Sequence, residues 1–218
     1  MRRVAILKPI LLAIALATTA SSLGFAGEIV VPAKYATKPV DGGHNSYPFD
    51  GDHATRTHHV YRWRAFGLRP RVITGVAFRA AVYQDPIFYQ CRVTIILSTT
   101  WRGPSSLSQA FDRNVGPDAI VVFSGSAILD HPVATPVLAP FETVIAFERA
   151  FTYRPGPFRN LLVEIRSQCL GSGEDPAIEK VEDVRMGIVA AIGSFADELT
   201  EGNRLPHFGL VTQFITSP

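Results

Sequence analysis

Apolar and polar residues alternate along much of this chain with a period of two, which is the pattern of β-strands that bury one face. The alternating segments are residues 57–66, 71–82, 92–98, 143–153 and 159–168. In the last of them, Leu161, Val163 and Ile165 are expected to face a core, while Glu164 and Arg166 face outward. The chain is therefore predicted to consist mainly of half-buried strands.

The middle of the chain joins two strands through a turn-rich connection. The apolar run Ile120–Phe123 predicts a strand covered on both faces, and Ser126–His131 is predicted to be a further short strand. Between the two strands, Ser106 and Gln109 have the spacing of a capping box. That spacing predicts one helical turn that starts at residues 104–106.

Irregular positions are expected within two of the strands. Gly75 is predicted to mark a bulge or a close approach of another backbone. Arg149 falls on the otherwise apolar face of residues 143–153, and a bend near Ala150 would turn it outward. The first and last strands are expected at Ile29–Val31 and Phe208–Ile215, the last one inside a sheet.

About ten short strands, separated by turns rich in proline and glycine, are typical of an all-β fold. The 16 prolines and 17 glycines are spread through the chain, which disfavours long helices. We therefore predict an antiparallel sandwich of two sheets, jelly-roll-like, with one short helical turn. A closed barrel is the alternative, and residues 27–218 are expected to form one domain.

The first residues have the features of a secretory signal peptide. Arg2, Arg3 and Lys8 give a positive start, Ile10–Ala17 is apolar, and small residues precede a cleavage position after Ala26. The alternative is an uncleaved anchor, although the apolar run is short for a bilayer. We expect residues 1–26 to be a signal peptide and the protein to be secreted, periplasmic or on the cell surface.

Charge excludes some classes of partner. The net charge of +2 comes from the three basic residues of the leader, so the remainder is nearly neutral. A nearly neutral chain lacks the basic surface that nucleic acids require. It is also not attracted strongly to an anionic membrane once the leader is removed.

Cys91 and Cys169 are the only cysteines of the chain. A single pair in an exported protein predicts a disulfide, and two buried free thiols are the alternative. A zinc site would need more cysteines or histidines at close spacing.

The turn-rich loop 41–56 carries the residues that suit a metal best. Asp41, Asp50 and Asp52 have carboxylate oxygens that could bind Ca²⁺, and His44 is a possible ligand-binding residue. The simpler interpretation is that these are solvated loop residues. The loop lacks the later acidic ligand of an EF-hand.

Three aromatic residues are candidates for binding a sugar. Tyr61 and Trp63 are predicted to share one face of a strand, and Trp101 is expected in a loop. Aromatic rings bind the apolar faces of sugars when a few polar groups lie nearby. The alternative places Tyr61 and Trp63 in the core. We expect the loops 41–56 and 99–104 to form the binding site together at one end of the sandwich.

Several segments carry a resemblance to a known group of proteins. They are HHVYRWRAFG at 58–67, LSTT at 97–100, PSSLSQAFDRNVG at 104–116, IVVFSG at 120–125, IAFERAFTYRPGPFRNLLVEI at 145–165 and GLVTQF at 209–214. The set is similar to uncharacterised exported bacterial β-sandwich proteins of the PEP-CTERM-associated kind. The chain lacks the sorting tail that many of those proteins carry, so the resemblance implies export, and it brings no catalytic residues.

No catalytic set is evident in the sequence. Glu148 and Glu164 lie in strands and have no spacing that makes them the acid and base of a glycosidase. The nucleophile elbow G-x-S-x-G is absent. We therefore expect a non-enzymatic protein that binds a glycan or components of an extracellular matrix. The alternatives are a hydrolase or lyase acting on polysaccharide, and a structural protein of the envelope or matrix.

Overall fold

The computed structural model describes residues 27–40, 44–45, 47–51, 53–79, 87–131, 138, 140–172, 178–181, 189–194, 200–205 and 209–217. The predicted signal peptide, residues 1–26, lies outside the described residues.

The described chain is built from strands and three 3-10 turns. The strands are β1 (Gly27–Val31), β2 (His44–Asn45), β3 (Thr55–Tyr61), β4 (Arg71–Phe78), β5 (Ile87–Thr100), β6 (Ile120–His131), β7 (Thr143–Tyr153), β8 (Asn160–Ser172), β9 (Ile178–Val181), β10 (Val189–Ser194), β11 (Asn203–Leu205), β12 (Gly209–Leu210) and β13 (Thr212–Ser217). The 3-10 turns are η1 (Ala33–Ala36), η2 (Trp63–Phe66) and η3 (Phe111–Arg113).

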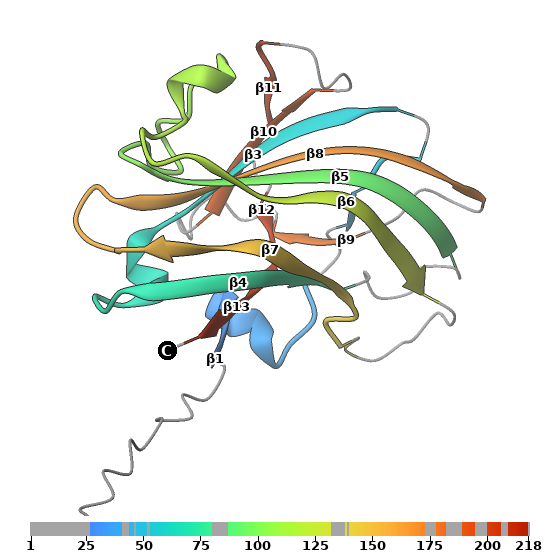
Figure 1. The fold of residues 1–218 in the computed structure, drawn as a ribbon, viewed down its shortest axis with the longest axis horizontal. Helices are drawn as coiled ribbons and strands as arrows, with labels where there is room; N and C mark the ends of the chain where they lie inside the picture. The colour runs from blue at the N-terminus through green and yellow to red at the C-terminus, as the bar shows by residue number, and fades with distance from the viewer. Residues whose placement is uncertain are drawn as a thin grey trace, which may run out of the picture.

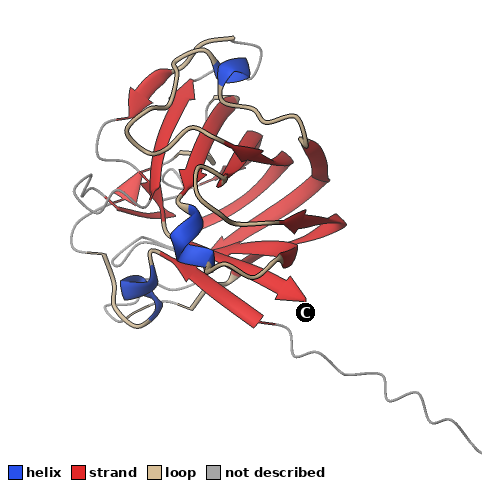
Figure 2. Ribbon diagram, turned by 90° about the vertical axis from the view of Figure 1, so that its left-hand side faces the viewer, coloured by secondary structure: helices blue, strands red, loops and turns tan. Residues whose placement is uncertain are grey.

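The strands form two main antiparallel sheets that pack face to face as a sandwich (Figures 1 and 2). One sheet has the order β1-β13-β4-β7, and the other has the order β11-β10-β3-β8-β5-β6. A small third sheet contains β12, β9 and β2. The edge strands β6 and β7 of the two main sheets lie side by side. The all-β sandwich predicted from the sequence is therefore confirmed.

The connections between the sheets follow the jelly-roll order. The strands β1, β3, β4, β5, β6, β7, β8 and β13 are counted here from first to eighth along the chain. In that count one sheet has the order first, eighth, third, sixth, and the other has second, seventh, fourth, fifth. These are the two interlocked Greek keys of a jelly roll. Strands β10 and β11 extend the second sheet beyond β3.

The core fills the space between the two sheets. Residues of β5 and β8 with period-two spacing contribute one side of it, and residues of β4, β7 and β13 contribute the other. Aromatic rings from the two sides pack against each other. The ring centroids of Tyr61 and Phe214 lie 5.0 Å apart in an edge-to-face arrangement, and Phe66 packs edge to face against both Phe214 and Tyr153. Edge-to-face pairs of this kind add to the stabilisation from apolar burial.

Gly75 lies at the predicted irregularity of β4. The register passes from Ile73 opposite Phe151 to Gly75 opposite Ala146, so β7 bulges over residues 147–150. A side chain at Gly75 would place its Cβ 3.0 Å from the carbonyl oxygen of Ile145. The bulge also leaves the side chain of Arg149 exposed, which confirms the two irregularities expected from the sequence.

Three local predictions in this part of the chain are wrong. Residues 104–105 form a turn, while the helical turn is η3 at Phe111–Arg113, and η1 and η2 are further 3-10 turns. Ser126–His131 is not a separate strand, because β6 is continuous. Nor is β6 covered on both faces: it is an edge strand, and Val121 is 42% exposed.

The cysteines lie opposite each other on neighbouring strands. Cys91 of β5 pairs in register with Cys169 of β8, and the two sulfur atoms form a disulfide. This confirms the predicted bond, and the alternative of two free thiols is wrong. The bond closes a loop with a sequence separation of 78 residues.

We predict that replacing both cysteines by alanine lowers the free energy of unfolding by roughly 2–4 kcal/mol, because the unfolded chain regains the freedom that the closed loop removed. Urea unfolding of the double variant and of the oxidised wild type measures the difference. Equal unfolding midpoints for the oxidised and the reduced wild-type protein would contradict the prediction.

Candidate functional site

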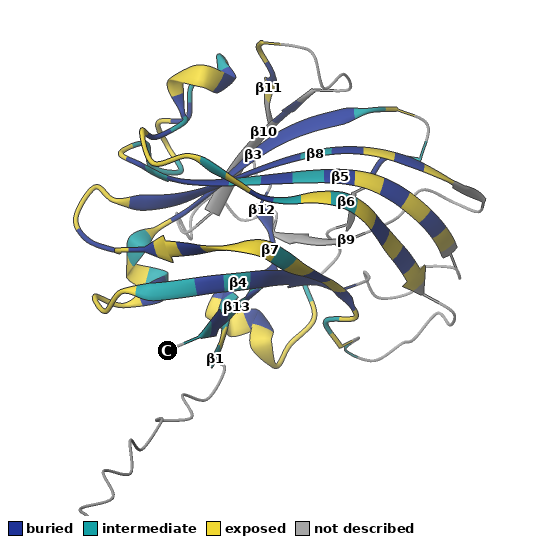
Figure 3. Cartoon of the chain, in the orientation of Figure 1, coloured by how far each residue is buried: buried dark blue, intermediate teal, exposed yellow. Residues whose placement is uncertain are grey.

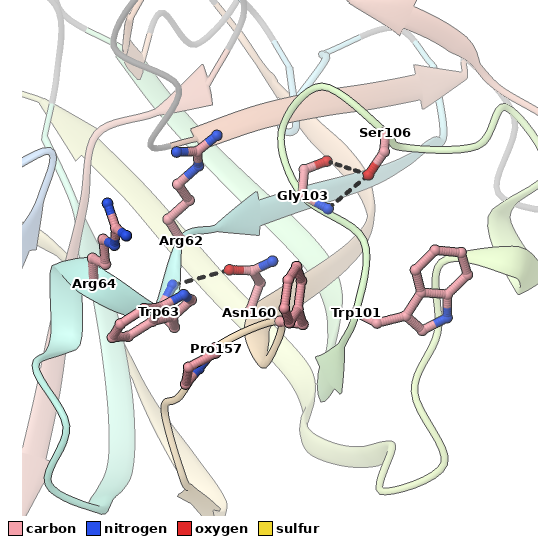
Figure 4. A pocket seen from close by; sticks show the side chains of 9 residues that line it. Arg62, Trp63, Arg64, Trp101, Gly103, Ser106, Pro157 and Asn160 are labelled. Carbon is pink, nitrogen blue, oxygen red and sulfur yellow. Dashed lines mark hydrogen bonds between the residues drawn. The ribbon is translucent and has the colours of Figure 1, made fainter.

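A pocket lies at the end of the sandwich where β3 and β5 end and β8 begins. The register places Tyr61 opposite Leu161 and Thr100 opposite Asn160, so the loops after β3 and β5 meet the turn before β8. The pocket has a volume of about 420 Å³ (Figure 4). It is lined by Arg62, Trp63, Arg64, Trp101, Gly103, Ser106, Pro157, Phe158 and Asn160.

Asn160 fixes the two tryptophan-bearing loops relative to each other. The backbone N–H of Trp63 donates a hydrogen bond of 3.0 Å to its Oδ1 atom, as Figure 4 shows. Its Nδ2 group donates a hydrogen bond of 2.9 Å to the carbonyl oxygen of Arg102. Asn160 is buried and is the first residue of β8. The position of β8 in its sheet therefore sets the separation of the two loops.

The aromatic rings of the pocket are accessible. Trp101 is 66% exposed, and the guanidinium of Arg102 stacks on its ring at 4.1 Å. That guanidinium also donates hydrogen bonds to the carbonyl oxygens of Ser106 and Arg113, so it holds the loop in place. Trp63 is half-buried in η2, where Arg64 lies 5.4 Å from its ring centroid.

Phe158 occupies an unusual backbone position at the edge of the pocket. It is the third residue of the turn 156–159, in which the N–H of Arg159 donates to the carbonyl oxygen of Gly156. Its φ angle of 59° is in the left-handed region, which turns of this kind normally fill with glycine or asparagine. The side chain is nevertheless 80% exposed, so packing does not explain why an aromatic residue is present.

The loop that carries Trp101 is anchored where it returns to the sheet. At Gly116 an added Cβ would lie 1.8 Å from the carbonyl oxygen of Thr99, so only glycine fits. The N–H of Gly116 donates to the hydroxyl of Ser98, and the N–H of Thr99 donates to the carboxylate of Asp118 at 2.6 Å. These contacts hold both ends of the connection against β5.

A buried cluster of charges lies beneath the same connection. Glu164 accepts hydrogen bonds from Arg56 at 3.0 Å, from Arg166 at 2.7 Å and from His58 at 2.7 Å. Phe111 covers the cluster, with its ring 4.4 Å from the guanidinium of Arg56. Strand β3 is therefore buried along its whole length (Figure 3), and Glu164 is buried although it faces away from the core.

Burial and charge set the protonation states in this part of the sheet. Burial alone would raise the pKa of Glu164, but His58, Arg166 and Arg56 outweigh it and lower that pKa to about 2. For His58, burial and the two arginines lower the pKa against the opposing effect of Glu164. On the core face of the same strand, burial lowers the pKa of His59 to about 3. Glu164 is thus ionised and both histidines are neutral at pH 7.

The structure brings together two of the residues predicted for ligand binding and separates the others. Trp63 and Trp101 line one pocket, although Trp63 belongs to η2 and does not share a strand face with Tyr61. Tyr61 is buried in the core, where its hydroxyl lies 2.7 Å from the hydroxyl of Thr212. The core interpretation therefore holds for Tyr61 but not for Trp63.

The described residues 47–51 of the loop 41–56 do not meet the loop 99–104, so the prediction that the two loops form one site is wrong for that part of the chain. Asp50 precedes β3, whereas Trp63 follows it and lies beside the loop of Trp101, so the two loops lie at opposite ends of that strand. Asp50 is buried and accepts a hydrogen bond from the backbone N–H of His53.

The predicted Ca²⁺ site is left untested. Asp41 and Asp52 lie outside the described residues, as does the side chain of His44, whose backbone forms part of β2. In the described part of the chain, no group of three or more acidic, histidine or cysteine side chains gathers as a metal site would require.

Sequence reasoning missed the residues that complete the pocket: Arg62, Arg64, Phe158 and Asn160. A signal existed for Phe158, because it follows Pro157 in a turn where glycine is common. The sequence carries no signal for Asn160, because the role of this residue depends on the register between β8 and its neighbouring strands.

The fold and the pocket together define an antiparallel jelly-roll protein with an aromatic site at the ends of its strands. Protein-family models, curated proteins and solved structures were compared with the chain, and none of them matches it. No helix among the described residues has the length and apolar character needed to cross a membrane.

We predict that the protein loses stability steadily as the pH falls from 7 toward 3. Below about pH 6.5 the unfolded chain protonates histidines that the fold keeps neutral, and below about pH 4.5 it protonates the carboxylate that the fold keeps ionised. The free energy of unfolding, measured with urea, should fall between pH 7 and pH 4.5 in both the wild type and His59→Gln. We expect this fall to be smaller by about 2–3 kcal/mol in His59→Gln than in the wild type. An identical loss in both proteins would contradict the assignment.

We also predict that Phe158→Gly raises the free energy of unfolding by about 1 kcal/mol, because glycine adopts the left-handed conformation without steric cost. Thermal and urea unfolding measure the change. Phe158→Leu, which keeps the strained backbone, is the matched control and should unfold as the wild type does. A less stable glycine variant would show that the phenylalanine ring packs against the fold.

Proposed function

We propose that this chain is an exported, non-enzymatic protein that binds polysaccharide at the pocket between Trp63 and Trp101. The observation that carries the proposal is the presentation of accessible aromatic rings from three loops that Asn160 and the turn 156–159 hold in fixed positions. Rings with polar groups beside them suit sugars, because the ring faces pack against C–H groups and the polar groups bind hydroxyls.

Rigid positioning supports binding as the role of this pocket. The two hydrogen bonds of Asn160 and the stack of Arg102 on Trp101 order the loops before any ligand arrives. A preformed site avoids the entropy cost of ordering loops during binding. The strained backbone at Phe158 has the same meaning, because strain of this kind is typical of functional positions.

The hydrogen-bonded acid and base side chains of the described residues lie away from the pocket. Glu164 and His58 are buried beneath Phe111 and use their hydrogen bonds within the charge cluster. The described residues that line the pocket include no carboxylate and no histidine. These observations favour retention of a polysaccharide over its cleavage.

Export is the part of the proposal that rests on the leader. Residues 1–26 have the charge and apolar pattern of a signal peptide, and the resemblance to exported β-sandwich proteins agrees with it. A disulfide such as Cys91–Cys169 is typical of proteins that fold in an oxidising compartment.

We predict that a soluble polysaccharide changes the tryptophan fluorescence of the protein, because Trp63 and Trp101 are its only two tryptophans and both line the pocket. Titration with galactan, xylan, mannan, β-glucan, alginate and polygalacturonate identifies the best ligand. Trp101→Ala should weaken its binding about tenfold or more, measured by isothermal calorimetry.

Phe88→Ala is the matched control, because Phe88 is an exposed aromatic residue near the opposite end of β5. It should bind as the wild type does. Failure to bind any polymer of the panel would refute the proposal, and the release of new chain ends from a bound polymer would refute its non-enzymatic part.

A further inference from the structure

We propose that the polysaccharide held at this pocket is acidic, that its sugars carry carboxylates, and that Arg62 and Arg64 select it. The inference rests on the proposed function and names the ligand class for the same site. The geometry that supports it is the set of polar groups that the pocket offers to a ligand.

The side-chain acceptors among the lining residues each make a hydrogen bond within the fold. Asn160 accepts from the N–H of Trp63 and donates to the carbonyl of Arg102. The hydroxyl of Ser106 accepts from the N–H of Gly103 at 2.9 Å and donates to the carbonyl oxygen of the same residue. Among the described residues, no aspartate or glutamate lines the pocket. Apart from Asn160, the side chains there that carry charge or N–H donors are two guanidinium groups and the indole N–H groups.

Arg62 and Arg64 have no competing carboxylate in the described part of the chain. Neither takes part in an ion pair there, and both are exposed. Arg64 contacts the ring of Trp63, and Figure 4 shows the side chains of Arg62 and Arg64 on the same side of Trp63. By contrast, the guanidinium of Arg102 is occupied by two carbonyl oxygens.

A pocket with two guanidinium groups, unpaired among the described residues, discriminates between sugars by charge. A guanidinium presents a planar fork of N–H groups that matches the two oxygens of a carboxylate. A neutral sugar offers the arginines only uncharged hydroxyl oxygens, which cannot form the two-oxygen ion pair. A uronic acid therefore complements both the arginines and the aromatic rings.

The test compares matched acidic and neutral polymers on the full chain. Calorimetric titrations with polygalacturonate and with neutral galactan of similar length should show tenfold or tighter binding of the acidic polymer, with affinity falling as salt rises. Arg62→Gln/Arg64→Gln should lose at least tenfold in affinity for polygalacturonate. The control Arg92→Gln/Arg149→Gln removes the same charge from exposed positions on β5 and β7 and should lose little.

The outcomes separate this inference from the proposed function. Equal affinity for the two polymers, or an equal loss in the control, overturns the inference while polysaccharide binding stands. Dextran sulfate bound as tightly as polygalacturonate overturns the carboxylate assignment. If no polymer binds to a wild-type protein that unfolds cooperatively in urea, both proposals fall.

Discussion

Strand β8 pairs with β3 on one side and with β5 on the other, and this double register determines the position of each chemical feature described above. Cys169 meets Cys91 toward one end, Glu164 lies opposite His58 in the middle, and Asn160 meets the loops of the pocket at the other end. A slip of one residue would turn every side chain of β8 to the opposite face. The disulfide, the charge cluster and the pocket would then be lost together.

The connection between β5 and β6 changes the environment of the outer sheet face. An outward-facing strand residue in a sandwich is normally solvated, but residues 107–114 cover Arg56, His58 and Glu164. The covering segment is itself held by β-type hydrogen bonds with residues 200–202. Removing one partner from such a cluster leaves a buried charge uncompensated, which is costly. The cluster therefore requires the connection to sit in one position.

That requirement links the charge cluster to the pocket. The segment that covers Glu164 follows the loop of Trp101 directly, and the guanidinium of Arg102 bonds to carbonyl oxygens at its start and end. The fit of Gly116 against Thr99 holds the returning chain against β5. The position of the Trp101 loop is thus set by contacts on the sheet face in addition to the hydrogen bond of Asn160 within the pocket.

The sequence was sufficient for the fold class, because period-two alternation and turn residues are local properties. The strands around Leu161 and Ile145 and the bulge at Gly75 follow from patterns within short segments, and the disulfide follows from the presence of a single pair of cysteines. The site was only half predictable. Trp63 and Trp101 are recognisable by residue type, but the partnership of Asn160 with both loops depends on a register that spans a large part of the chain.

The same reason explains the wrong pairing of the loops 41–56 and 99–104. Alternation shows where a strand begins and ends but not which strand ends share an edge of the sheet. In this sheet β8 lies between β3 and β5 and is antiparallel to both, so the loop after β3, and not the loop before it, lies beside the start of β8 and the end of β5. Arg62 and Arg64 line the pocket for that reason. Their local positive charge could not be inferred from the composition, because the chain as a whole is nearly neutral. Two guanidinium groups that have no carboxylate partner among the described residues lie beside aromatic rings, and the proposed selection of acidic ligands rests on this local arrangement, which the net charge does not reveal.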